Sequence, residues 1–157
     1  MTFGFRCPPL AAASLIALPL AATALTPALA ADMPAQVEQV VRDLDLSDVD
    51  YRPDPRGTDL TGQLPDGSLV RIDFHDRGRE ELEEIEAHGR DAVPLSQVAA
   101  VLPEGLLAAG PIGPDDGFYE IDFDDDGSVD IEGLTADGRR FDAEYDRAGR
   151  LDELDYD

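Results

Sequence analysis

The sequence has no lysine and a single cysteine, Cys7, close to its start. A domain that begins after Cys7 has no thiol, which excludes disulfide bonds, thiol nucleophiles and cysteine-based zinc sites. Histidine is scarce too, since His75 and His88 are the only two. His75 lies on the polar phase of a strand-like segment and His88 in a linker, so we expect both to be solvated. These absences predict a protein without catalytic residues, and therefore not an enzyme.

Positive charge is also scarce. The chain carries 12 arginines against 35 aspartates and glutamates, and every acidic residue lies at or after Asp32. Without Arg6, the remaining segment has a formal charge of −24. Such a charge disfavours nucleic acid and anionic lipid as partners. It is also the ordinary means of keeping a small exported domain soluble.

The N-terminal segment has the order of a secretory signal. A charge at Arg6 precedes a stretch from Leu10 to Leu25 without charged residues, and small residues follow at 28–30. This order predicts a cleaved signal peptide over residues 1–31 and a periplasmic or secreted protein. Pro19 interrupts an already short apolar run, so we expect no membrane insertion after cleavage.

The remainder, residues 32–157, contains an internal repeat. Asp66-Gly67 and Asp137-Gly138 are 71 residues apart, and the apolar alternation that follows each pair stays in phase. The sequence therefore predicts one domain made of two related halves, residues 33–86 and residues 93–157.

Each half opens with a helix-like segment. After Pro34, apolar residues recur at intervals of three and four, and Pro94 begins a similar stripe that should end by Leu102. Strand-like alternation follows, with Gly-containing turns at residues 125–127 and 136–138 that predict hairpins. In the first half, the strands at 49–52 and 58–64 are expected to be joined by a loop.

The predicted fold class is α+β, with two related halves that are each a helix packed on a small antiparallel β meander. The six residues between the halves are too few for a flexible tether. We therefore expect the halves to pack against each other.

The domain resembles a duplicated PepSY-type domain, the module found in bacterial peptidase propeptides and small secreted proteins, with the second half matching better than residues 33–86. The resemblance lies in the segments 118–121, 137–146 and 149–154. An additional hairpin at 124–135 departs from the pattern. The duplicated architecture is also similar to that of secreted β-lactamase inhibitor proteins. Both resemblances imply an extracytoplasmic, non-catalytic module, and the PepSY family is associated with restraining or chaperoning peptidases.

One short motif suggests a cation. The segment from Asp122 to Gly127 fits the D-x-D-x-D-G pattern of a calcium loop. The candidate ligands are the carboxylates of Asp122, Asp124, Asp126 and Asp130. Position twelve of the loop is Gly133, which lacks the bidentate carboxylate of an EF-hand, and the flanks are strand-like. A hairpin tip in an acidic chain explains the motif equally well, so we expect no metal or cofactor as the default, with calcium as the alternative.

The function expected from these observations is an exported, non-catalytic binding module. Its partner would be an unidentified protein, in particular a peptidase or another envelope protein that it inhibits or regulates. The loops Tyr51 to Leu60 and Leu107 to Gly117 are the expected contact regions. The alternative is a calcium- or cation-responsive acidic envelope protein.

Overall fold

The computed structural model describes residues 33–54, 57–76, 80–108 and 110–157. The predicted signal peptide lies outside these residues. Nearly all of the expected domain is described. Among the described helices, none is both long and apolar enough to cross a membrane.

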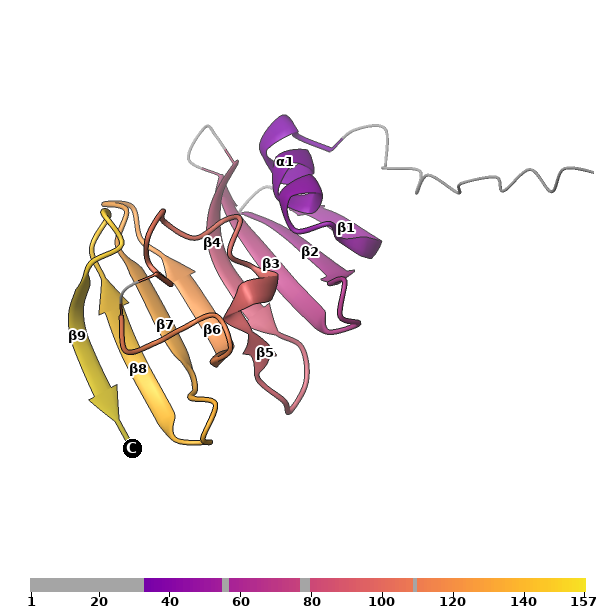
Figure 1. Cartoon of the computed structure of the whole chain (residues 1–157). Coiled ribbons are helices and arrows are strands. Elements are labelled where there is room, and N and C mark those ends of the chain that lie inside the picture. Colours follow the sequence, from indigo (N-terminus) through magenta and orange to yellow (C-terminus); the bar gives the residue numbers. More distant parts are fainter. Residues whose placement is uncertain (1–32, 55–56, 77–79, 109) are drawn as a thin grey trace, which may run out of the picture.

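A single antiparallel β-sheet dominates the fold (Figure 1). Among the described residues it contains nine strands, whose main path runs β1-β2-β3-β4-β6-β7-β8-β9, while β5 pairs with β6 off this path. The strands are β1 (Ser47–Asp54), β2 (Gly57–Gln63), β3 (Leu69–Asp76), β4 (Glu80–Ala87), β5 (Val93–Pro94), β6 (Gly117–Phe123), β7 (Val129–Leu134), β8 (Arg140–Tyr145) and β9 (Leu151–Tyr156).

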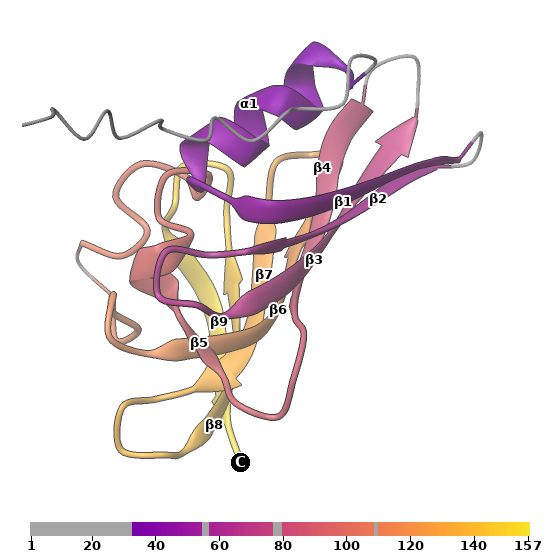
Figure 2. The ribbon, with the colours of Figure 1, turned by 90° about the vertical axis from the view of Figure 1, so that its right-hand side faces the viewer.

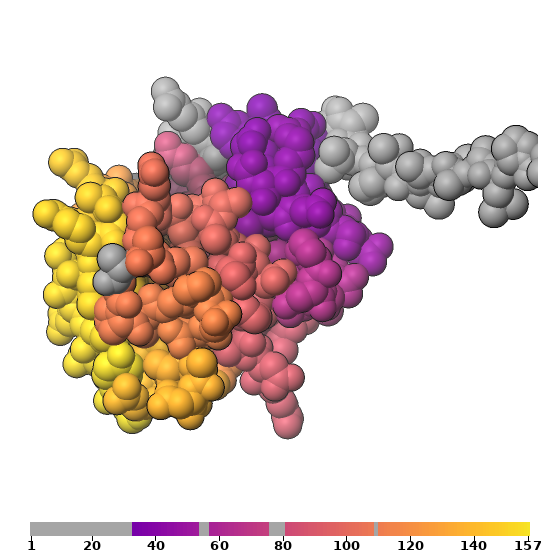
Figure 3. Space-filling model, in the orientation of Figure 1, coloured from indigo at the N-terminus to yellow at the C-terminus, as the bar shows by residue number. Residues whose placement is uncertain are grey.

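Two segments cover the same side of the sheet (Figures 1 and 2). The helix α1 (Ala35–Asp43) covers the strands of the first half, with Val37 and Val41 buried. The described residues of the segment 95–116 cover the second half, and this segment begins with the short 3-10 helix η1 (Leu95–Gln97). Figure 3 shows both segments forming the surface of this covered face.

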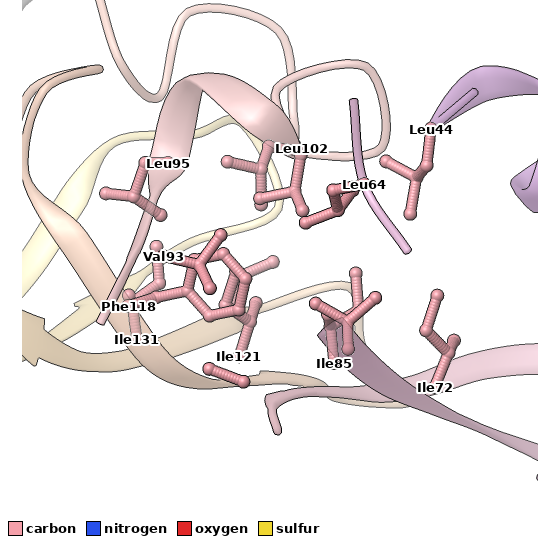
Figure 4. Close-up of a cluster of buried hydrophobic side chains, with 14 of the residues drawn as sticks. Leu44, Leu64, Ile72, Ile85, Val93, Leu95, Leu102, Phe118, Ile121 and Ile131 are labelled. Atoms are coloured by element: carbon pink, nitrogen blue, oxygen red, sulfur yellow. The ribbon is translucent and has the colours of Figure 1, made fainter. Parts of the chain in front are cut away.

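The hydrophobic core lies between the sheet and these two segments. Leu95 and Leu102 point from the covering segment toward Phe118 and Ile121 on the sheet (Figure 4). All the large side chains of this layer belong to one cluster that includes residues from α1 to β8. The two halves of the chain therefore share a core, as expected from the short linker.

The predicted hairpin turns are present. Gly127 and Gly138 have φ values of 88° and 86°, in the left-handed region that glycine adopts without strain. In the first of these turns the Asp124 N–H donates to the Ser128 carbonyl, and the Gly127 N–H donates to the Asp124 carbonyl. Turns with the same bonding pattern join β2 to β3, β7 to β8 and β8 to β9.

The fold class predicted from the sequence is wrong. The structure is mostly antiparallel sheet with one α-helix among the described residues, and it does not consist of two separate helix-on-meander units. The reason is the pairing of β4 with β6, which places Ile85 directly opposite Ile121, both fully buried. Pairing these strands removes two sheet edges and buries both isoleucines, so one continuous sheet forms.

The predicted second helix is also absent. After η1, the Val98 N–H donates to Leu95 and the Val101 N–H to Val98, so the segment turns tightly with i-to-i+3 bonds. Pro103 then follows, without an N–H to donate. This irregular path buries Leu95, Val98, Leu102, Leu106 and Ile112 along the whole second half. A helix of two turns is too short to cover that length.

The two regions expected to be contact loops are more structured than predicted, and their role as contact regions stays a prediction. The described part of Tyr51 to Leu60 belongs mostly to β1 and β2, which are paired strands. In the region 107–117, Ile112 is fully buried. The Asp116 carboxylate accepts hydrogen bonds from the N–H groups of Gly113 and Ala136. This region is therefore part of the packed structure.

Candidate functional site

The sheet face opposite the covered one, here called the open face, carries the polar side chains of the strands. Strand register aligns its carboxylates into rows, because directly opposed residues in antiparallel strands share a face. The first carboxylate row crosses seven strands and consists of Asp59, Asp73, Glu84, Asp122, Asp130, Glu144 and Glu153. The second carboxylate row runs beside it and consists of Glu86, Glu120, Glu132, Asp142 and Asp155.

Positive charge enters these rows only toward β1. Arg71 on β3 lies in register with Glu86, and its guanidinium is 3.0 Å from Asp73 and 3.7 Å from Asp59. Arg52 lies opposite Asp59 at the end of the first row. From β4 to β9 every described residue in both rows is acidic. The open face is therefore strongly negative over the second half of the sheet.

The centre of this surface is a group of three carboxylates. Glu84, Glu120 and Asp122 each offer an oxygen atom within 4.8 Å of the others. Partial burial, followed by repulsion from Glu120 and other neighbours, raises the pKa of Glu84 to about 7. Partial burial and neighbouring carboxylates also raise the pKa values of Glu120 and Asp122. The fold therefore holds like charges together at a cost, which an approaching cation would relieve.

The raised pKa values extend along the first row. The pKa of Asp73 is raised chiefly by desolvation, despite the opposing effect of Arg71. Desolvation and then repulsion from Asp124 raise the pKa of Asp130. One carboxylate oxygen of Asp73 and one of Asp130 are buried without a hydrogen-bond partner among the described residues.

The four candidate calcium ligands fall into two groups. Asp122 and Asp130 lie opposite each other in β6 and β7, within the first carboxylate row. Asp124 and Asp126 lie in the hairpin turn, where the Ser128 hydroxyl is 3.1 Å from the Asp124 carboxylate and 2.7 Å from the Asp126 carboxylate and donates its one proton to either of them. The Ser128 N–H also donates to Asp126, and these bonds lower the pKa of Asp126. The turn carboxylates are thus occupied in closing the hairpin.

Gly133, at position twelve of the calcium motif, faces the core. A Cβ atom there would lie 2.1 Å from the Gly117 carbonyl oxygen and 2.8 Å from the Phe141 ring. No carboxylate could occupy this position without displacing the core. The turn hydrogen bonds of Asp124 and Asp126 and the close packing around Gly133 therefore explain these motif residues without calcium.

A polar hollow of about 260 Å³ borders the first row where β4 meets β6. Its lining includes His75, Glu83, Asp122 and Asp124. The Nδ1 atom of His75 is 3.5 Å from the Glu83 carboxylate. His75 is thus on the polar side of β3, as its position in the strand pattern suggested, and it has a carboxylate neighbour.

The carboxylate rows were not foreseen from the sequence. Their local signal is visible, because segments such as Glu120-Ile121-Asp122 alternate acidic and apolar residues. That alternation shows only that the acidic residues of one strand share a face. Which strands are neighbours, and in which register, depends on pairings between distant segments.

Comparison with known proteins provides no homologue for this chain: no family model, no curated protein and no solved structure matches it. The PepSY resemblance therefore stays a prediction.

Proposed function

We propose that this protein is an exported, non-catalytic binding module that uses the acidic open face to bind a basic region of another protein. The observation that carries the proposal is the run of two carboxylate rows from β4 to β9 without a basic residue among the described positions. Burial, followed by repulsion from neighbouring carboxylates, raises the pKa of Glu84 to about 7, and a basic partner would reduce that repulsion. Such complementarity also accelerates association.

The resemblance to PepSY-type modules supports a class of partner. A PepSY-type module would restrain or regulate a peptidase, so a peptidase or another envelope protein with a basic surface is the proposed target. Inhibition would then result from steric blocking by the carboxylate-covered open face.

The test compares two variants of equal charge. The face variant combines Glu84→Gln, Glu120→Gln and Asp122→Asn, and the turn variant combines Asp66→Asn, Asp126→Asn and Asp137→Asn. The probe is an oligo-lysine peptide, titrated by calorimetry at low salt. Because exposed ion pairs contribute about 0.2–1 kcal/mol each, we expect the face variant to bind about tenfold more weakly than the wild type.

The turn variant should retain most of the wild-type affinity. Equal losses in the two variants would show that only net charge matters, and would contradict a site on the open face. A second measurement, inhibition of purified secreted peptidases by the wild type and both variants, tests the proposed target class.

A cation-responsive protein is the second candidate function. It is favoured by the convergence of Glu84, Glu120 and Asp122 within 4.8 Å. Hard cations such as calcium prefer several carboxylate oxygens around one point. Selective stabilisation by calcium, in the absence of any binding to basic peptides or proteins, would favour this function over the first.

A further inference from the structure

We propose that the edge strand β9 binds an extended segment of the partner, which adds to the sheet as a tenth strand with basic residues at alternate positions. This inference rests on the proposed function, because it names how a basic partner would continue the two carboxylate rows. It concerns the backbone of β9, the last strand of the sheet. Among the described residues, no strand pairs with the outer side of β9.

The outward backbone groups of β9 can be assigned from its inner pairing. The Asp157 N–H donates to the Arg140 carbonyl at 3.3 Å. In an antiparallel pair, hydrogen-bonded and non-hydrogen-bonded residue pairs alternate. Asp155 and Glu153 therefore direct their backbone groups toward β8, whereas Leu154 and Tyr156 direct theirs away from the sheet. The outer edge thus presents N–H and C=O groups at two successive alternate positions.

The other edge of the sheet is less suited to strand addition. β1 contains Pro53, which has no N–H, and its register with β2 shifts between Ser47 and Asp50. Asp48, inside the shifted stretch, has a φ of 50°. Bulges and prolines of this kind are features by which proteins block edge pairing. β9 also has a register shift, between Leu151 and Glu153, but its residues 153–156 pair in unbroken register with β8 and include no proline.

The side chains of β9 define the sequence of the added strand. Glu153 and Asp155 end the first and second carboxylate rows on the open face. Residues opposite them in an added strand would have Cβ atoms about 4.5–5.5 Å away, where an arginine or lysine forms a favourable pair. Basic residues are therefore expected at the positions that face the carboxylates.

The intervening positions of the added strand would face the covered side. There β9 presents the half-buried Leu154 and the exposed Tyr156. Tyr156 is 38% exposed, and the Arg139 guanidinium lies 3.7 Å from the centroid of its ring. These neighbours favour apolar side chains, so the partner segment would alternate basic and apolar residues.

A second copy of this chain is a poor occupant of the edge. Antiparallel pairing of β9 with itself would place Glu153 and Asp155 of one copy opposite the same residues of the other, and like charges directly opposed destabilise a sheet. The high negative charge of each copy adds to this repulsion.

The test uses a capped peptide that alternates arginine and valine, with a control peptide of the same composition in which the arginines form one block. Binding of the peptides is measured for two full-length variants, Tyr156→Pro and Tyr156→Val. Both variants lose the tyrosine ring, but only proline removes the outward N–H. We expect the alternating peptide to bind Tyr156→Pro about tenfold more weakly than Tyr156→Val.

If the two Tyr156 variants bind the alternating peptide equally, or if the two peptides bind the wild type equally, strand addition is wrong. Loss of oligo-lysine binding in the face variant would then still support the proposed function, so the two failures are distinguishable. Should Tyr156→Pro misfold, N-methylation of the peptide bonds that face β9 provides the same test on the wild-type protein. A homodimer that Tyr156→Pro abolishes would also overturn the inference, because the edge would then belong to a second copy.

Discussion

Glu84 lies directly opposite Asp122 across the β4–β6 pair, and each belongs to a different half of the chain. The next pair along these strands is Ile85 with Ile121, on the buried face. The junction of the two halves is therefore favourable on one face of the sheet and repulsive on the other.

Stability should decrease as the pH rises toward neutrality. The pKa of Glu84 is raised from 4.5 to about 7 in the folded protein. Between these values the folded state holds a proton that the unfolded chain has released, so raising the pH lowers the free energy of unfolding. We expect the thermal midpoint to fall between about pH 5 and pH 8, and to fall less in Glu84→Gln. Glu81→Gln, an exposed substitution on the same strand, is the control; an equal effect there would contradict the role of Glu84.

A second, opposite dependence is expected at acidic pH. Hydrogen bonds from Arg150 lower the pKa of Asp146 from 3.8 to about 2. This carboxylate stabilises the fold above its unfolded pKa, and the stabilisation is lost as the pH falls from about 4 to about 2. Asp146→Asn should therefore lower the thermal midpoint at neutral pH. Arg150→Ala should cause a similar loss, and the double variant should lose less than the sum of the two. Additive losses would show that the pair does not act together.

Calcium should stabilise the protein more than sodium chloride of equal ionic strength, since screening by a monovalent salt reduces repulsion without selectivity. We expect Glu84→Gln combined with Asp122→Asn to abolish the selective part of the thermal shift. Asp124→Asn combined with Asp126→Asn should retain it, because the Ser128 N–H donates to Asp126 and the Ser128 hydroxyl lies within hydrogen-bond distance of both turn carboxylates. The reverse outcome would place the cation in the hairpin turn.

The two halves should unfold together. Ile121 is fully buried at the junction, so Ile121→Ala should cost about 2–5 kcal/mol in the free energy of unfolding. Because one core extends through both halves, urea unfolding should remain a single transition when followed by circular dichroism and by tyrosine fluorescence. Leu69→Ala, at a side chain that is 48% exposed, should cost much less. Two separate transitions would mean that the halves fold independently.

Gly133→Ala should be strongly destabilising. The added methyl group would collide with the Gly117 carbonyl and the Phe141 ring, and overpacking of this kind costs about 1–3 kcal/mol or more. Gly89→Ala is the matched control, because a Cβ atom at Gly89 meets nothing within 4 Å. Chemical denaturation of the two variants measures the difference. A small effect at Gly133 would indicate that β6 and β7 can separate locally.

Much of the local structure is evident from the sequence. The helix after Pro34 and the turns at Gly127 and Gly138 lie where the pattern predicts them, because each depends on neighbouring residues. The segment after Pro94 has the same apolar stripe as a helix, yet it forms a 3-10 turn followed by an irregular path. In this segment, burial of apolar side chains along the sheet determines the backbone path, and the local pattern does not.

The sequence by itself determines that each strand has one apolar and one acidic phase, because side chains alternate along any strand. It also determines the strong negative charge and the scarcity of histidine and cysteine. Only the tertiary structure decides that Glu84, Glu120 and Asp122 converge, and that the acidic phases join into two rows. The deciding event is the pairing of β4 with β6, which connects segments more than thirty residues apart in the chain and depends on burying Ile85 against Ile121. No local pattern contains that information, since strand order and register arise from contacts between distant segments.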